Sequence, residues 1–447
     1  MTTELVTTRW SSDRAEDRIA VENPADGSAL AVVQGGGADE IDTAVHAAQA
    51  GFASWSRRSA AERGSYLSRA AQIIREHADE LAALESAENG KPVSQAREFD
   101  IEACIAIFEM FGRLIRDHTG ESRDRGPILD VTELCPYGVV GAIIPFNWPP
   151  IHTAGKAAPA LAVGNAVVIK PGEQAPLTAM RIVELVGQVL PDDVLHIVPG
   201  TGAAGRALSA HRLVRALSFT GSPATGADVL GSAASNLVPT VMELGGKNPL
   251  LVFEDADLDS AAAWAIDGGF FNQGQACTAA SRLLVHRRVY DAFIERLAPA
   301  VERLIVGDGA EPGTHVGPLV TRAHRSRVLE YIDLGVSEGA TIAAQAPLPD
   351  DPRLAGGFYV PPTLLTGVDP AMRIAREEVF GPVVVVIAFD DEDEAVRIAN
   401  DTDFGLVAAV FHVRSVAGCA SGQVDRGGDG VCQSLQPSGL GCSVRWQ

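Results

Sequence analysis

The most regular pattern of hydrophobic and polar positions lies between residues 139 and 244. Five short runs rich in β-branched residues alternate there with alanine-rich runs whose apolar positions recur at helical spacing. This alternation predicts a doubly wound, Rossmann-like parallel sheet with helices on both faces, and such sheets bind nucleotides at the carboxyl ends of their strands. The predicted strands are Val139–Ile144, Ala166–Lys170, Val194–Val198, Leu217–Thr220 and Thr240–Leu244. The predicted helices between them are Ile151–Ala162, Leu177–Leu190, Gly202–Ala210 and Thr225–Ala234.

A second α/β region follows the first. Leu250–Phe253 and Arg282–Val285 have the composition of strands, whereas Leu258–Phe271 and Tyr290–Leu304 have helical periodicity. The same kind of pattern continues to about Phe411, so the sequence predicts a second α/β domain.

Helical periodicity also dominates the N-terminal part, over about 38–89 and 98–116. The polar, glycine-containing segment 117–135 predicts a turn with short strands, as in a hairpin arm. The predicted division is a nucleotide-binding domain (1–118 and 137–245), an arm (119–136), a second α/β domain (246–412) and a tail (413–447).

The tail differs from everything before it. Residues 413–447 contain seven glycines, five serines and three of the six cysteines, with neither helical nor strand periodicity. Two interpretations stay open: a specialised tail, or a hypothetical altered reading frame whose product forms no core. Reading the coding DNA in all frames tests the second, which fails if no frame restores periodic sequence.

Composition and charge narrow the class of protein. With 447 residues, 46% hydrophobic and 21% charged, the chain can bury two or three cores. Its net charge of -21 argues against nucleic-acid and membrane partners. The N-terminus lacks a secretory pattern, and the cysteines have no metal-ligand spacing, so a reduced cytoplasmic enzyme without a metal is predicted.

Two residues carry the strongest candidate chemistry. Cys277 follows the polar turn of FNQGQACT between a predicted helix and a predicted strand, which suits a nucleophile better than an inert core cysteine. Glu243, in MELGGKNP, ends a predicted strand and precedes two glycines. Burial there would raise its pKa towards the range of a general base, although a solvated strand-end charge is the alternative.

Other polar residues follow neighbouring strand ends. Asn147, in PFNWP, is either a helix cap or an oxyanion donor. Gly221 and Gly226, in FTGSPATG, are expected to free backbone amides for a phosphate at a helix N-terminus. Lys170 and Glu173, in KPGE, suit ribose hydroxyls, although surface charges would look similar.

From about Ala20 to Phe411 the chain resembles the aldehyde dehydrogenase superfamily, in its non-acylating branch. MELGGKNP and FNQGQACT at this separation are highly specific, and PFNWP, KPGE, FTGSPATG and EEVFGPV occur in the family's order. The resemblance implies that Cys277 is the nucleophile and Glu243 the base for the deacylating water. It implies that Asn147 and the Cys277 backbone N–H stabilise the oxyanion.

The resemblance also implies a cofactor site. Lys170 and Glu173 would hold the adenosine ribose, Ser222 would lie near phosphate, and Glu378 and Phe380 would lie beside the nicotinamide ribose and ring. The further cofactor-binding positions that it implies are Ile144, Gly221, Gly226 and Leu244. NAD is expected rather than NADP, because a carboxylate at Glu173 would repel a 2′-phosphate.

The implied reaction is oxidation of a small-molecule aldehyde to its carboxylic acid through a cysteine thiohemiacetal and thioester. Three alternatives stay open: a CoA-acylating dehydrogenase, a non-oxidative thiol esterase, and a catalytically impaired cofactor-binding chain. The resemblance implies a homodimer or homotetramer built with the 119–136 arm, whereas the unmatched tail lacks the strand that completes a neighbour's sheet in the family.

Overall fold

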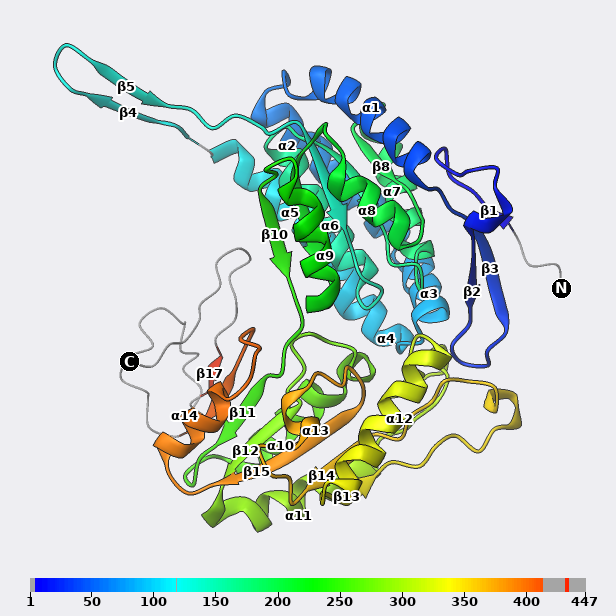
Figure 1. The fold of residues 1–447 in the computed structure, drawn as a ribbon, viewed down its shortest axis with the longest axis vertical. Helices are drawn as coiled ribbons and strands as arrows, with labels where there is room; N and C mark the ends of the chain where they lie inside the picture. Colours follow the sequence, from blue (N-terminus) through cyan, green and yellow to red (C-terminus); the bar gives the residue numbers. More distant parts are fainter. Residues whose placement is uncertain (1–4, 118, 413–430, 434–447) are drawn as a thin grey trace. The chain divides into compact units, whose positions relative to one another are not determined.

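The computed structural model describes residues 5–117, 119–412 and 431–433 (Figure 1). The chain forms two compact units. Unit 1 contains the chain up to Asn23, Ser28–Asn89 and Val93–Glu243, and unit 2 contains Pro24–Gly27, Gly90–Pro92 and the chain from Leu244 onward. Across the described ranges, no helix is both long and apolar enough to cross a bilayer.

Unit 1 is built around a five-stranded sheet of order β10-β9-β6-β7-β8, in which all neighbours pair in parallel. Its strands are β6 (Val139–Ile143), β7 (Ala166–Lys170), β8 (Leu195–Ile197), β9 (Val214–Thr220) and β10 (Thr240–Glu243). Every residue of β6 and β7 is buried, as expected for central strands covered on both faces. The predicted parallel α/β sheet is confirmed.

Helices cover both faces of this sheet (Figure 1). One group packs α8 against α1 and α9, and the other packs α6 against α7, α2 and α5. The bounds are α1 (Ala38–Trp55), α2 (Ala60–Glu76), α3 (Ala78–Asn89), α4 (Val93–Gln95), α5 (Glu102–Leu114), α6 (Pro149–Ala162), α7 (Leu177–Gly187), α8 (Gly202–Ala210) and α9 (Pro223–Ala234). A π-helical stretch, Ala96–Ile101, joins α4 to α5.

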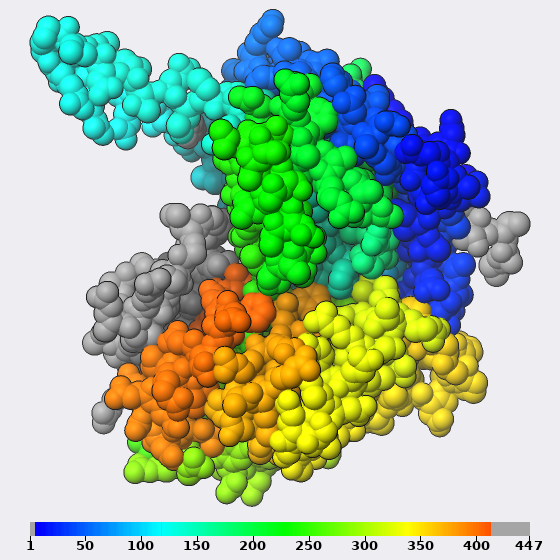
Figure 2. Space-filling view, in the orientation of Figure 1, coloured from blue at the N-terminus to red at the C-terminus, as the bar shows by residue number. Residues whose placement is uncertain are grey.

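Two smaller sheets complete unit 1. The first has order β1-β3-β2, with strands β1 (Leu5–Val6), β2 (Arg18–Glu22) and β3 (Ala29–Gln34), which the sequence pattern did not predict. The second is the antiparallel hairpin of β4 (Glu121–Asp124) and β5 (Leu129–Thr132), which extends away from the rest of the unit (Figure 2).

Unit 2 contains a seven-stranded mixed sheet of order β13-β14-β15-β12-β11-β16-β17. Its strands are β11 (Pro249–Val252), β12 (Arg282–His286), β13 (Thr341–Gln345), β14 (Thr363–Thr366), β15 (Val383–Phe389), β16 (Ala409–Phe411) and β17 (Val431–Gln433). The helices are α10 (Leu258–Phe270), α11 (Tyr290–Glu302), α12 (Arg322–Ser337), α13 (Arg373–Arg376) and α14 (Glu392–Asn400). Separate apolar clusters line the two faces of the sheet, so this unit is also an α/β layer structure.

The tail contributes one strand that its sequence did not predict. β17 pairs antiparallel with β16, with Val410 opposite Cys432. Pairing of three residues uses backbone groups alone, so it needs no alternation of apolar side chains. The rest of the predicted tail, 413–430 and 434–447, lies outside the described residues.

Candidate active site

The predicted site residues of unit 1 gather at the carboxyl edge of its sheet. Lys170 lies opposite Ile143, which in turn lies opposite Phe219, and Thr220 lies opposite Glu243, so four strands end together. The predicted site residues at this edge are Ile144, Asn147, Lys170, Glu173, Gly221, Ser222, Gly226 and Glu243.

The turn after β6 holds Asn147 in a buried position. Ile144 extends the strand by donating its backbone N–H to the Lys170 carbonyl at 3.0 Å. The Phe146 carbonyl accepts a hydrogen bond from Asn89 Nδ2 at 2.8 Å, which fixes the turn. Asn147 is 3% exposed. The N-cap of α6 is Trp148, so Asn147 is not the helix cap that was one of its two interpretations.

The turn after β7 packs closely against the turn after β6. A Cβ on Gly172 would lie 2.9 Å from the Phe146 nitrogen, so only glycine allows this approach. Lys170 is buried, and this burial lowers its pKa, while the charge of the half-buried Glu173 raises it. The charge of Glu173 therefore favours the protonated form of Lys170 at the strand end.

The loop after β9 differs in detail from the sequence expectation. The Gly221 N–H donates to the Glu243 carbonyl at 3.0 Å and the Gly226 N–H to the Ser222 carbonyl at 2.9 Å, so these amides are engaged inside the protein. Ser222 is the N-cap of α9, and its Oγ accepts the Thr225 N–H at 3.3 Å. The positive end of α9 nevertheless opens at this edge, which favours an anion.

Of the two settings considered for Glu243, the structure shows the solvated strand end and not the buried one. Glu243 ends β10, which is the edge strand of the sheet, and its side chain is exposed. A strand at the edge of a sheet has a neighbouring strand on one side only, so its residues are less covered. The apolar run around Glu243 does not indicate that its strand lies at the edge.

Sequence reasoning missed Lys156, which interacts with Glu243. Lys156 lies in α6 and donates from Nζ to Ser218 Oγ at 3.0 Å. Burial lowers the pKa of Lys156 to about 8, and the negative charge of Glu243 partly opposes this shift. The available signal was a single charge within an otherwise apolar helix that covers the sheet.

In unit 2, an unusual turn precedes Cys277. Asn272, Gln273 and Gly274 have φ values of 50°, 57° and 67°, so three consecutive residues are left-handed. Buried side-chain amides hold this turn: Gln273 Nε2 donates to the Pro318 carbonyl at 2.9 Å, and Gln275 Oε1 accepts the Val320 N–H at 3.1 Å. Cys277 itself is half-buried.

The glycine pair of MELGGKNP packs against both the Cys277 turn and Glu378. A Cβ on Gly246 would lie 2.4 Å from the Cys277 carbonyl oxygen, and this oxygen accepts Asn248 Nδ2 at 2.7 Å. Glu378 Oε1 accepts the Gly246 N–H at 3.0 Å, while a Cβ on Gly245 would lie 2.2 Å from Oε2. The glycines therefore bring Cys277 and Glu378 close to one backbone loop, which begins at Leu244.

The two adjacent glutamates have different surroundings. Glu377 pairs with Arg373 and Tyr331, and the hydrogen bond from Arg373 contributes most to lowering its pKa to about 2. Burial instead raises the pKa of Glu378, against the Gly246 hydrogen bond and the charge of Lys247. Glu377 is thus held in an ion pair, whereas Glu378 faces the glycine loop.

Phe380 adopts a left-handed backbone with φ of 60°, which is uncommon for a residue with a side chain. His324, in the first turn of α12, hydrogen-bonds the Phe380 carbonyl through Nε2 at 2.7 Å, and the two rings lie edge to face at 6.0 Å. Burial lowers the pKa of His324, so the neutral ring donates here. Sequence reasoning missed His324, because nothing in its local pattern indicates this long-range contact.

Comparison with known proteins agrees with this geometry. The sequence model of the Aldehyde dehydrogenase family matches residues 10–425, which extends past Phe411 into the tail. An aldehyde dehydrogenase of Didymella fabae is 49% identical over 403 residues, covering 90% of this chain and 82% of the relative. A betaine aldehyde dehydrogenase of Mesorhizobium japonicum is 40% identical over 405 residues, covering 90% of this chain and 83% of the relative.

Solved structures give the same result. PnpE in complex with nicotinamide adenine dinucleotide has a TM-score of 0.88 and 41% identity, covering 90% of this chain and 83% of the other. The Staphylococcus aureus betaine aldehyde dehydrogenase in complex with NAD+ has a TM-score of 0.85 and 37% identity, covering 90% of this chain and 81% of the other. The predicted resemblance and fold class are confirmed, and the chain belongs to the aldehyde dehydrogenase family.

Proposed function

We propose that the chain oxidises an aldehyde to its carboxylic acid with NAD, and that Cys277 is the nucleophile. The observation that carries this proposal is the turn before Cys277. Three left-handed residues and two buried glutamine side chains fix the approach to one half-buried thiol. The left-handed backbone conformation costs free energy at Asn272 and Gln273, which carry side chains. Backbone strain of this kind is typical of a functional site.

The residues at the carboxyl edge of unit 1 fit a dinucleotide. Lys170 and Glu173 offer a donor and an acceptor for ribose hydroxyls, and Ser222 caps a twelve-residue helix whose N-terminus suits phosphate. Glu173 favours NAD over NADP because its charge repels a 2′-phosphate. When bound, NAD supplies the acceptor for the electron pair that leaves the aldehyde carbon.

The protein's own groups perform the acyl chemistry. The Cys277 thiolate attacks the aldehyde carbon, and Asn147 with the Cys277 N–H stabilises the resulting negative oxygen. Loss of one such donor typically costs about 3–4 kcal/mol of transition-state stabilisation. Oxidation leaves a thioester on Cys277. Glu243 then takes a proton from the water that releases the acid. The positive charge of Lys156 interacts with the Glu243 carboxylate.

The test is NADH formation by the purified chain with chemically diverse aldehydes and no added CoA. Turnover with NAD that Cys277→Ser abolishes supports the proposal. A strict requirement for CoA would instead assign the acylating reaction, and ester cleavage without nicotinamide would assign a thiol esterase. A marked preference for NADP would overturn the role proposed for Glu173.

We propose that unit 1 binds the cofactor, that unit 2 supplies the nucleophile, and that the β4–β5 hairpin joins copies into a homodimer or homotetramer. A cytoplasmic location remains an expectation from the sequence.

A further inference from the structure

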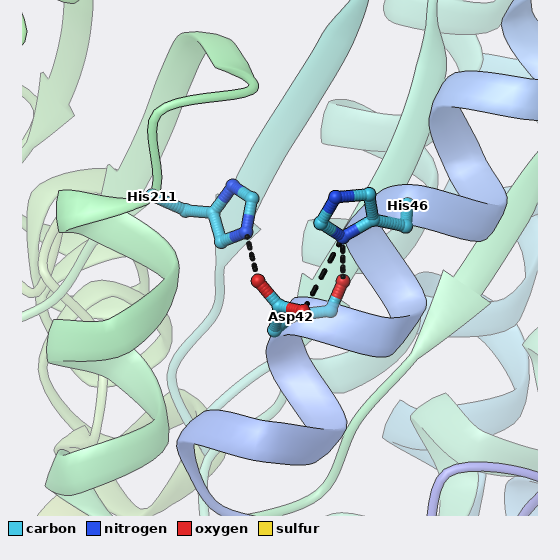
Figure 3. A group of neighbouring side chains, drawn as sticks. All are labelled: Asp42, His46 and His211. Carbon is cyan, nitrogen blue, oxygen red and sulfur yellow. Dashed lines mark hydrogen bonds and ion pairs between the residues drawn. The ribbon is translucent and has the colours of Figure 1, made fainter.

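A cluster of three metal-ligating side chains lies in unit 1, on elements that the proposed reaction does not use. Asp42 and His46 belong to α1, and His211 directly follows the last residue of α8 (Figure 3). Asp42 and His46 are four residues apart, so they share one face of the helix. We propose that Asp42, His46 and His211 form a binding site for a divalent transition-metal ion such as Zn²⁺.

The distances suit a single ion. Asp42 Oδ1 lies 3.1 Å from His211 Nε2, and Asp42 Oδ2 lies 3.4 Å from His46 Nδ1. Ligand atoms that share one ion at about 2.1 Å lie about 3.0–3.4 Å apart, depending on its geometry. One ligand atom of each residue lies within 4.8 Å of the other two, so closing the set needs only small side-chain movements.

The donor set selects the class of ion. Two imidazoles and one carboxylate suit Zn²⁺, Ni²⁺ or Cu²⁺, whereas Mg²⁺ and Ca²⁺ prefer oxygen ligands. The Asp42 and His46 side chains are 61% and 60% exposed, so an ion can reach the site and water can complete its coordination.

Three hydrogen bonds define the cluster without metal. His46 Nδ1 donates to the Asp42 carbonyl at 2.8 Å, and His211 Nδ1 accepts the Leu213 N–H at 3.1 Å. His211 Nε2 therefore carries the proton that faces Asp42. A metal ion takes the place of this proton and of the proton on His46 Nδ1, and each proton moves to the other nitrogen of its ring. The bonds to Leu213 and to the Asp42 carbonyl are then lost, so uptake has a structural cost and we expect moderate affinity.

Binding would join α1 to the connection between α8 and β9. His211 is only three residues before β9, the strand that ends at the Gly221 loop. A bound ion would therefore tie α1 to the start of this strand and raise the thermal stability of the protein.

The experiment is a calorimetric titration of Zn²⁺ into the full chain and into His46→Ala, His211→Ala and His77→Ala. His77 is the matched control, because its Nδ1 also bonds a carbonyl four residues earlier, at 2.9 Å. Cysteine thiols also bind Zn²⁺, and all four proteins keep their cysteines. The measured quantity is therefore the difference between wild type and variant in the number of Zn²⁺ ions bound per chain. Melting curves without metal establish that each variant is folded.

We expect the wild type and His77→Ala to bind one equivalent more than His46→Ala and His211→Ala, or to bind it at least tenfold more tightly. Zn²⁺ should also raise Tm only in the first two proteins. Equal binding by all four proteins would overturn the site. Loss of Zn²⁺ binding in only one of the two cluster variants would overturn the three-ligand arrangement. An equal loss of Zn²⁺ binding in His77→Ala would also overturn the site, because it would show nonspecific binding by histidines.

Discussion

Lys156 shows how one residue can serve the site at a cost in stability. The residue is 8% exposed, and within the described part of the chain the Ser218 hydroxyl and the charge of Glu243 replace water around its amino group. A fall of its pKa from 10.5 to about 8 corresponds to about 3 kcal/mol at neutral pH. The unfolded chain binds more protons than the folded one between these values, so stability rises with pH across this window.

Replacement of Lys156 by Met should therefore stabilise the protein at pH 7, by about 1–3 kcal/mol after loss of the Ser218 hydrogen bond. The advantage should shrink as the pH rises from about 8 towards 10.5, because wild-type Lys156 loses its charge there. Thermal melts of both proteins at pH 7 and pH 9.5 measure this difference. Ser218→Ala controls for the lost hydrogen bond, and a gap that grows with pH would contradict the argument.

At the scale of single elements, the left-handed turn before Cys277 allows little variation. Gly274 has φ of 67°, and a Cβ there would lie 2.1 Å from the Gly381 carbonyl oxygen. Because the Gly381 carbonyl oxygen belongs to the backbone, it cannot move aside without shifting its whole segment.

Gly274→Ala should therefore lower Tm strongly and abolish aldehyde oxidation. Gly231→Ala is the matched control, because a Cβ on this α9 glycine meets nothing within 4 Å. The control should be neutral or stabilising by about 0.5–1 kcal/mol, since alanine favours helix more than glycine. Calorimetric melting and NADH formation measure both variants, and equal Tm values would refute the predicted clash.

The elements that the sequence predicted well are those whose residues are buried on both faces. The short apolar runs of β6 and β7, alternating with helical runs, predicted buried strands, and the end of β7 placed Lys170 correctly. The pattern of β2 alternates between exposed and buried residues over only five positions, so its short signal was overlooked.

Motifs in the sequence indicated the site residues Cys277 and Glu378. Lys156 and His324 were missed because their contacts are with residues far away in the sequence.

At the scale of the whole molecule, the hairpin arm carries the clearest sign of self-association. Its exposed apolar side chains are 62–69% accessible: Ile128, Leu129, Val131 and Leu134. Exposed apolar groups gathered on one projecting element usually mark an interface.

Leu129→Asp with Val131→Asp should therefore reduce the mass of the particle in solution, because buried charges without partners oppose association. Size-exclusion chromatography with light scattering measures this change. Ser122→Asp on the same hairpin is the control, since Ser122 is already polar and exposed. An unchanged mass in the double variant would show that copies associate elsewhere or not at all.

The turn at the tip of the same hairpin is a suitable place to insert a short peptide into the protein. Gly126 has φ of 80°, its N–H is held by Asp124 Oδ1 at 2.8 Å, and a Cβ there would touch nothing within 4 Å. A short peptide inserted at this turn would disturb no buried contact of the described chain. It would present an epitope, a fluorophore or a surface tether at a position far from Cys277 in the sequence.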